Sequence, residues 1–253
     1  MSVDLSKCRV LVTGGAGFIG SHLVDRLVSI GSNVVVLDDL SSGSLKNLSS
    51  SLGRIEFVKG SLLDSGLVER VVKGCDVVFH LAANPEVRVG STSPSTHFNQ
   101  NVLATFNLLE AVRRCGSVKL FVFTSSSTVY GEPSVFPTPE DYAPLKPISV
   151  YGASKLACEA LISSYSFSFK FRSVIFRLAN IVGSRLNHGV IYDFIRKLRV
   201  NPRVLEVLGD GSQSKSYLYV DDCIDGMLLG VEKSSGQVEI FNVGSEDKVS
   251  VVE

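Results

Sequence analysis

The chain has 253 residues, 45% of them hydrophobic, and its 25 Lys and Arg balance its 25 Asp and Glu to a formal net charge of +0. A chain of this length can bury one large core, or form one domain with a smaller lobe. The balanced charge provides no basic field for nucleic acid or for a membrane surface, so we expect neither as a partner.

The cysteines and the first seven residues indicate where in the cell the protein is found. The five cysteines are scattered, odd in number and never in a C-x-x-C pair, which predicts free structural thiols rather than disulfides or a metal site. The first seven residues lack the apolar stretch of a signal peptide, and no apolar run is long enough to span a bilayer. We therefore expect a soluble cytoplasmic protein.

A glycine-rich turn lies between an apolar run at 9–12 and a helical pattern at 21–28. Gly14, Gly17 and Gly20 allow a tight turn, a close approach of the backbone to a pyrophosphate, and packing of the helix on the strand. The amide groups and dipole of the helix then hold the anion. The order strand, glycine turn, helix predicts a dinucleotide site.

A second predicted strand, at 33–38, completes the βαβ unit and ends in Asp38. A carboxylate at this place accepts hydrogen bonds from the adenosine ribose and repels an added phosphate, so NAD is expected rather than NADP. The alternative is an ordinary βα turn that binds no nucleotide. This alternative is disfavoured because a strand precedes the glycines, a helix follows them and an acid ends the next strand.

Strand-like runs continue to alternate with helical patterns along the chain. Further strands are predicted at 55–58, 76–81, 119–123 and 173–176, and helices near 65–73, 97–115 and 150–168. Apolar strands joined by helices predict an α/β fold with a doubly wound parallel sheet, the Rossmann fold. The proline-rich stretch at 132–147 is expected to be an ordered surface loop.

Tyr151 and Lys155 are four residues apart in a predicted helix, so they share one face. Tyr142 and Lys146 have the same spacing, but Pro144 lies between them and prevents a regular helix. To act as a base near neutral pH, a tyrosine needs its pKa lowered by about 3 units, or roughly 4 kcal/mol. One cation at about 5 Å supplies roughly 3 kcal/mol of this, so Lys155 and an oxidised nicotinamide achieve it jointly.

A run of hydroxyl side chains at 124–128 follows the strand at 119–123, at the carboxyl edge of the sheet where doubly wound folds bind ligands. A serine in this run can hydrogen-bond the substrate oxygen whose proton Tyr151 removes. Taken alone, the segment is equally compatible with a polar serine turn.

At this point the sequence closely resembles a known family, the extended short-chain dehydrogenase/reductases, and within them the nucleotide-sugar epimerases. The resemblance covers essentially the whole chain, through TGGAGFIGSH, HLAANPEVR, NVLATFNLLEA, SSSTVYG, YGASK, RLANIVG and GDGSQSKSYLYVDD. It is strongest to the archaeal-type enzymes that act on UDP-glucose and UDP-galactose. It implies reversible oxidation of the sugar at C4 through a 4-keto intermediate, with NAD regenerated and retained.

The resemblance also implies roles for individual residues. Tyr151 is the catalytic acid/base, Lys155 lowers its pKa and binds the ribose, and Ser126 is the catalytic hydroxyl. In the related 4,6-dehydratases an Asp-Glu pair follows this hydroxyl. Here Ser127 and Thr128 stand in those places, so elimination of water lacks its proton carriers.

The same resemblance gives two sets of binding residues. Asp64 is expected to meet the adenine, and Asn101 to support the site. The full set assigned to the cofactor is Gly14, Gly17, Phe18, Ile19, Gly20, Asp38, Asp39, Ser42, Gly43, Leu63, Asp64, Leu81, Ala82, Ala83, Asn101, Ser125, Tyr151 and Lys155. The set assigned to the UDP-sugar is Arg88, Ser126, Tyr151, Asn180, His188, Val190 and Lys215. Lys215-Ser216 replaces the family's usual Arg-Asp, which leaves a positive charge for a phosphate but no bidentate fork.

The expected organisation is an NAD-binding domain over 1–176 and 216–243, with a substrate lobe over 177–215 and 244–253. The lobe is expected to be incomplete, because family members continue beyond the place where this chain stops. The predicted helices 97–115 and 150–168 are apolar on more than one face. The resemblance implies a homodimer through these two helices; the alternative is that they pack only on the sheet.

Other readings stay open. A 4-epimerase acting on UDP-glucuronate or UDP-N-acetylhexosamine, a decarboxylase or a reductase would share Tyr151, Lys155 and Asp38. A redox-sensing module that holds NAD without turnover is a further alternative, although such modules usually lose the tyrosine or the lysine.

Overall fold

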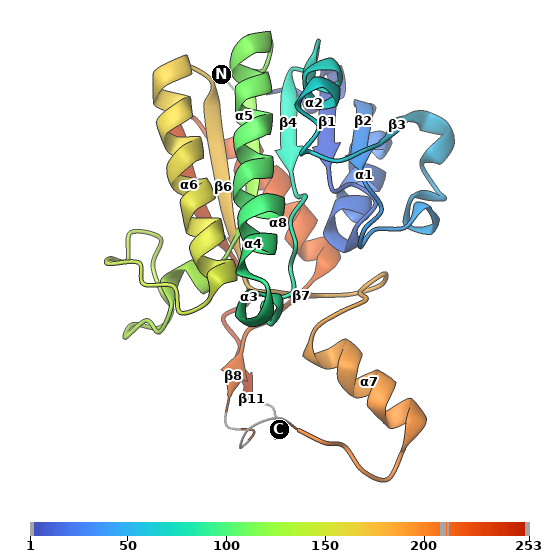
Figure 1. The fold of residues 1–253 in the computed structure, drawn as a ribbon, viewed down its shortest axis with the longest axis vertical. Helices are drawn as coiled ribbons and strands as arrows, with labels where there is room; N and C mark the ends of the chain where they lie inside the picture. Colours follow the sequence, from blue (N-terminus) through green and yellow to red (C-terminus); the bar gives the residue numbers. More distant parts are fainter. Residues whose placement is uncertain (1–2, 208–210, 212, 251–253) are drawn as a thin grey trace.

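The computed structural model describes residues 3–207, 211 and 213–250. Its centre is a sheet of seven parallel strands in the order β10-β6-β5-β4-β1-β2-β3 (Figure 1). This confirms the predicted doubly wound α/β fold. The strands are β1 Arg9–Thr13, β2 Asn33–Asp38, β3 Ile55–Lys59, β4 Val77–His80, β5 Leu120–Ser126, β6 Arg172–Leu178 and β10 Val238–Val243.

Helices cover both faces of the sheet because alternate side chains of each strand point to opposite faces. Val10 and Val12 pack in a cluster with α1 and α8, whereas Leu11, between them, packs in a cluster with α2, α5 and α6. These helices are α1 Phe18–Ser29, α2 Ser65–Val72, α5 Ala104–Cys115, α6 Val150–Phe169 and α8 Val220–Lys233.

The predicted helix at 97–115 is interrupted. α3 Val89–Thr92 and α4 Pro94–His97 are single turns, and a π-helical stretch, η4 Phe98–Leu103, separates α4 from α5. π-Helical turns occur mostly as single-turn bulges inside α-helices, frequently at functional sites, and an α-helical hydrophobic pattern continues through such a bulge. Sequence periodicity therefore could not reveal this one.

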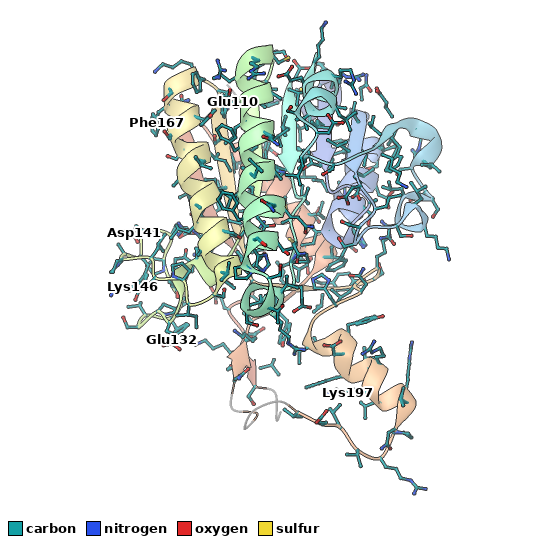
Figure 2. All side chains as sticks on the ribbon, viewed as in Figure 1. Glu110, Glu132, Asp141, Lys146, Phe167 and Lys197 are labelled. Atoms are coloured by element: carbon teal, nitrogen blue, oxygen red, sulfur yellow. The ribbon has the colours of Figure 1, made fainter. Side chains whose placement is uncertain are left out.

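The chain between β6 and α8 lies beyond the carboxyl edge of the sheet. β7 Asn180–Val182 pairs with β9 Tyr217–Tyr219, and β8 Ser214–Lys215 pairs with β11 Val249–Ser250. α7 Val190–Val200 contains no buried residue, and Figure 2 shows it, marked by Lys197, set apart from the sheet. Gly209, Asp210 and Ser212 of the GDGSQS motif, and the lobe residues 208 and 251–253, lie outside the described residues.

No helix in the described part of the chain combines the length and apolar character that a membrane crossing requires.

Candidate active site

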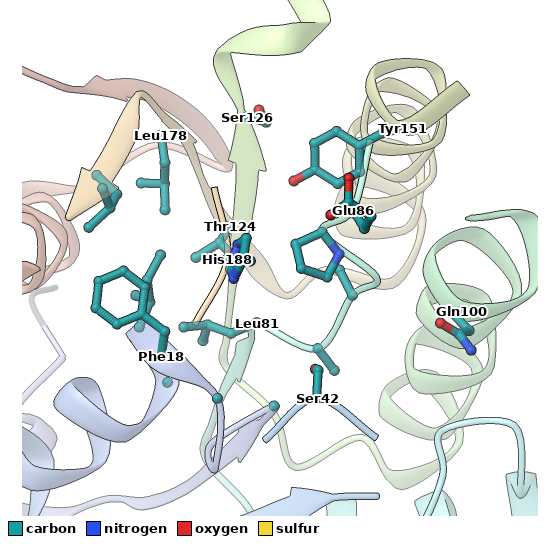
Figure 3. Close-up of a pocket in the computed structure, with 18 of the residues that line it drawn as sticks. Phe18, Ser42, Leu81, Glu86, Gln100, Thr124, Ser126, Tyr151, Leu178 and His188 are labelled. Carbon is teal, nitrogen blue, oxygen red and sulfur yellow. The ribbon is translucent and has the colours of Figure 1, made fainter. Parts of the chain in front are cut away.

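A cavity of ≈ 640 Å³ opens at the carboxyl edge of the sheet. Its walls come from the residues at the ends of β1, β2, β4, β5 and β6, from the start of α6, and from the segment 178–191 (Figure 3). Because parallel strands all end at the same edge, segments far apart in sequence meet here.

The glycine turn forms one end of this cavity. Gly14 has a φ of +70° and donates its N–H to the carbonyl of Leu37 at 2.9 Å. A Cβ on Gly20 would lie 2.1 Å from the Gly14 oxygen, so only glycine permits this contact. Gly17 is the N-cap residue of α1 and has no side chain that could cap the helix. The first amide groups of α1 are therefore available to an anion.

Asp38 ends β2 beside this turn and is 8% exposed. Its Oδ2 accepts from the backbone N–H of Ala16 at 2.9 Å, and its Oδ1 accepts from that of Leu40 at 2.8 Å. Burial raises the pKa of this carboxyl, while the two backbone donors lower it. The carboxylate is thus fixed in place at the cavity wall, where it can accept further hydrogen bonds from a ribose.

Tyr151 and Lys155 stand on the first two turns of α6, whose start is capped by Ser149 accepting from the Gly152 N–H at 3.0 Å. Lys155 is 3% exposed and donates from Nζ to the carbonyl of Thr124 at 2.8 Å. Burial lowers the pKa of Lys155 to about 8.

Burial raises the pKa of Tyr151 to about 12, and a hydrogen bond with Ser126 opposes this rise. Lys155 Nζ lies 5.9 Å from the centre of the Tyr151 ring, yet it does not offset the burial. From the sequence we expect Lys155 and oxidised nicotinamide together to lower the pKa of Tyr151 toward neutrality. This stays a prediction for the cofactor-bound protein.

A buried chain of hydrogen bonds joins the glycine turn to the helices behind it. His80 contacts the Thr13 hydroxyl through Nδ1 at 2.7 Å and the Thr105 hydroxyl through Nε2 at 2.8 Å. Thr105 donates to the carbonyl of Asn101 at 2.6 Å, so His80 must donate to Thr105 through Nε2. Burial lowers the pKa of His80 to about 3, which keeps the ring neutral. Sequence reasoning missed this histidine, which follows an apolar run like any strand residue.

Most residues that the sequence assigned to the site line the cavity. Ser125 is one of them, but its hydroxyl donates to Glu159 and not into the cavity. Arg88 is exposed at the rim. The predicted residues that line the cavity are Gly14, Gly17, Phe18, Ile19, Gly20, Asp38, Asp39, Ser42, Leu63, Leu81, Ala82, Ala83, Arg88, Ser125, Ser126, Tyr151, Lys155, Asn180, His188 and Val190.

Two predicted cofactor residues near the adenine end lie outside the lining. Gly43 packs against the turn instead, since a Cβ there would lie 2.9 Å from the carbonyl carbon of Ala16. Asp64 caps α2, accepting from the Leu67 N–H at 3.0 Å.

Two more predicted residues are also outside the lining. Asn101 is 2% exposed; it accepts from the Asn84 N–H at 2.7 Å and donates to the Ser154 hydroxyl at 2.9 Å, which agrees with a supporting role. Lys215 lies exposed in β8, away from the cavity wall. Sequence reasoning in turn missed lining residues, among them Leu62, Glu86, Gln100, Thr124, Thr128, Leu178, Asn187 and Tyr217.

A buried ion pair behind the site was also missed. Arg177 and Glu159 are 3% and 5% exposed, with 2.8 Å between Nη2 and Oε2. Arg177 also donates to the hydroxyl of Tyr130 and to the carbonyl of Glu140, each at 2.9 Å. The pair thus ties α6, one turn beyond Lys155, to β6 and to the loop after β5.

Comparison with known proteins supports the nucleotide-sugar epimerase resemblance seen in the sequence. The sequence pattern of the NAD dependent epimerase/dehydratase family matches residues 10–244. The UDP-glucose 4-epimerase of Mycolicibacterium smegmatis is 38% identical over 252 residues, which cover 97% of this chain and 80% of the relative.

Solved structures are similar as well. A crystal structure of a UDP-galactose 4-epimerase is 52% identical with a TM-score of 0.87, covering 96% of this chain and 79% of that one. A UDP-glucose 4-epimerase of Thermotoga maritima, crystallised with UDP-glucose, is 35% identical with a TM-score of 0.89, again covering 96% of this chain and 79% of that one.

Proposed function

Because the chain belongs to the NAD-dependent epimerase/dehydratase family, we propose that it interconverts UDP-glucose and UDP-galactose by reversible oxidation at C4 of the sugar. One observation carries the proposal: Tyr151, Lys155 and Ser126 border the same cavity as the glycine turn and Asp38. The groups that hold a dinucleotide and the groups that move a proton are therefore within reach of one substrate.

The glycine turn, the start of α1 and Asp38 fit the diphosphate and ribose of NAD, because a Cβ would fill the cradle and the amides there lack a cap. When bound there, NAD supplies the acceptor and then the donor of the C4 hydride. Tyr151 takes the proton from the 4-hydroxyl as the ketone forms and returns it as the opposite alcohol is restored. Ser126 donates a hydrogen bond to the same sugar oxygen.

The UDP moiety has to hold the sugar while the ketone presents its other face. Asn180, His188 and Val190 line the part of the cavity beyond β6, and Arg88 lies at its rim, which supports their assignment to the substrate. Lys215 remains a proposed phosphate contact without support from the cavity lining.

The experiment that tests this function is product analysis with purified protein. UDP-glucose, UDP-galactose, UDP-glucuronate and UDP-N-acetylglucosamine are each incubated and the products resolved by chromatography. We expect interconversion of the first two sugars and release of NAD when the protein is denatured. Loss of carbon dioxide from UDP-glucuronate, or epimerisation of that sugar alone, would replace the proposal with a related activity.

The matched variant is Tyr151→Phe, which keeps the ring and removes the hydroxyl. General acid-base groups contribute about 10²–10⁴-fold, so we expect a loss in kcat of that size with the NAD content unchanged. Full activity in this variant would refute the catalytic assignment. NAD binding without any turnover in the unaltered protein would favour the sensing module.

We further propose a homodimer through α5 and α6, in the cytoplasm. Phe106 is 40%, Phe167 56% and Phe169 46% exposed on these helices, and Figure 2 shows Phe167 on the outer side of α6. Exposed apolar residues of this kind support a protein–protein contact here. The five described cysteines are unpaired, which suits a reducing compartment. Analytical ultracentrifugation tests the dimer, and a monomer at working concentrations would count against it.

A further inference from the structure

The hydroxyl of Ser126 is held by its neighbour Thr128. At the end of β5, Ser126 caps a short 3-10 helix, η5 Ser127–Tyr130. Its Oγ accepts from the Thr128 backbone N–H at 3.2 Å and from the Thr128 hydroxyl at 3.0 Å. A serine oxygen has two lone pairs and one proton, so these two bonds occupy its acceptor capacity. What remains is the proton, which Ser126 has to donate elsewhere.

The cavity is where that proton can go. Ser126, Thr128 and Tyr151 all line it, and Figure 3 shows the Tyr151 hydroxyl directed toward the part of the cavity that Ser126 borders. The hydrogen bond between Ser126 and Tyr151 lowers the pKa of Tyr151, against the burial that raises it. A donor fixed in this direction favours negative charge on the tyrosine oxygen or on the sugar oxygen.

Glycines fix the backbone that carries Thr128. A Cβ on Gly152 would lie 2.8 Å from the Thr128 carbonyl oxygen, so η5 can approach α6 only because residue 152 is glycine. Gly131, which ends η5, has a φ of +71°, and a Cβ there would lie 1.9 Å from the Lys146 carbonyl oxygen. Thr128 is therefore held against the helix of Tyr151 and is not a freely moving surface residue.

We propose that Thr128 is a positioning residue that makes Ser126 an obligate hydrogen-bond donor toward the reacting oxygen and Tyr151. This rests on the proposed epimerase function. Thr128 itself carries no proton in the reaction. Its hydroxyl occupies one lone pair of Ser126 and its backbone N–H the other, so the serine oxygen cannot accept from Tyr151 or the sugar and can only donate to them.

The test compares Thr128→Val with Thr128→Ser. Valine keeps the size and branching and removes the donor hydroxyl, whereas serine keeps the hydroxyl. With Thr128→Val we expect kcat to fall about tenfold and the pH at which Tyr151 ionises to rise by about one unit, since one pKa unit corresponds to a factor of ten. The KM for UDP-glucose and the NAD content should not change. Thr128→Ser should restore both kcat and the pH profile.

Each other outcome overturns the proposal. A raised KM with unchanged kcat would make Thr128 a substrate contact. Equal losses in both variants would indicate lost packing, and an unchanged pH profile would show that Ser126 does not depend on Thr128.

A second measurement separates this proposal from the proposed function. The ultraviolet absorbance of the phenolate is followed against pH in holoenzyme, with Tyr151→Phe subtracted, and it needs no substrate. If no UDP-sugar is turned over, the epimerase proposal fails, while a shifted phenolate titration in Thr128→Val still supports the positioning role. An unshifted titration refutes it.

Discussion

The proposed cofactor side of the molecule, residues 9–126, and its proposed substrate side, residues 178–219, differ in how deeply their strands and helices are buried. On the cofactor side, residues 10–12 of β1 and 34–36 of β2 are 0% exposed. On the substrate side, α7 contains no buried residue, and the three-residue strands β7 and β9 contain only partly buried and exposed residues. The residues proposed for the dinucleotide therefore follow fully buried strands, whereas those proposed for the sugar nucleotide lie on partly buried segments.

Polar contacts tie residues 178–219 to α1 and to the loop after β2. Arg185 forms an ion pair with Asp25 of α1 at 2.8 Å, and Asn187 donates to the carbonyl of Ser42 at 3.2 Å. His22 contacts the substrate side at the carbonyl of residue 184, at 3.1 Å. The substrate side is therefore anchored over α1 and the loop after β2, while α7 extends beyond this anchor.

The largest effect is expected from a substitution in the glycine turn. Gly20→Ala places a Cβ 2.1 Å from the Gly14 oxygen and forces the backbone of the turn to shift. We expect at least about a tenfold loss of co-purifying NAD, because the pyrophosphate depends on that backbone. The measurement is NAD released on denaturation per mole of protein.

Gly53→Ala is its matched control, since a Cβ there meets nothing within 4 Å. It should leave the NAD content unchanged. Full NAD retention in Gly20→Ala would show that the cofactor side is less rigid than the core suggests.

The next largest effect, on the free energy of unfolding, is expected at the buried ion pair behind the site, where Glu159 neutralises Arg177. Glu159→Gln leaves the arginine charged and buried, so the free energy of unfolding should fall by about 3–5 kcal/mol. Glu69→Gln, which removes an exposed partner of Arg114, should cost less than about 1 kcal/mol. Urea denaturation measures both. Similar losses in the two variants would mean that the buried pair contributes no more to the free energy of unfolding than an exposed pair does.

Two leucines, one on each side, differ in burial. Leu108 on α5 is 0% exposed and Leu198 on α7 is 39% exposed. Leu108→Ala should lower the free energy of unfolding by about 2–5 kcal/mol, because it leaves a cavity in the core. Leu198→Ala should change it by less than about 1 kcal/mol. An equal effect on Tm would contradict the difference in packing between the two sides.

A change of one pH unit is expected to have a smaller effect than either of the two buried substitutions. Folding lowers the pKa of His80 from 6.5 to about 3, so between these values the unfolded chain binds more protons than the folded one. Stability should therefore fall as pH drops below 6.5, by up to about 1.4 kcal/mol per pH unit. His80→Gln stays neutral and should lose this part of the slope. Identical slopes in urea titrations of both proteins would show that His80 does not contribute.

Sequence reasoning performed differently on the two sides, for physical reasons. The glycine turn and Asp38 follow from local rules, because strand, turn and helix are contiguous and each glycine has a steric cause. The pair Tyr151 and Lys155 follows from helical spacing. These are the features for which neighbours in the chain determine the structure.

The remaining features depend on contacts between distant segments. The bond from Thr128 to Ser126 requires the geometry of η5, and the ion pair of Glu159 with Arg177 joins residues on α6 and β6 that carry no common pattern. The resemblance assigns Asp64 to the adenine, and the structure adds that its Oδ1 caps α2; the adenine contact stays a prediction. Resemblance places a residue near a site, but only the fold decides which atom it contacts.

The parallel sheet has one more practical consequence, at the edge away from the cavity. Cys8, Cys75 and Cys115 lie just before β1, β4 and β5, so these thiols gather where the strands begin. Cys8 and Cys115 are partly accessible there. A fluorescent dye or a surface tether coupled to Cys115 would thus leave the cleft unobstructed, so ligand exchange could be watched on immobilised molecules.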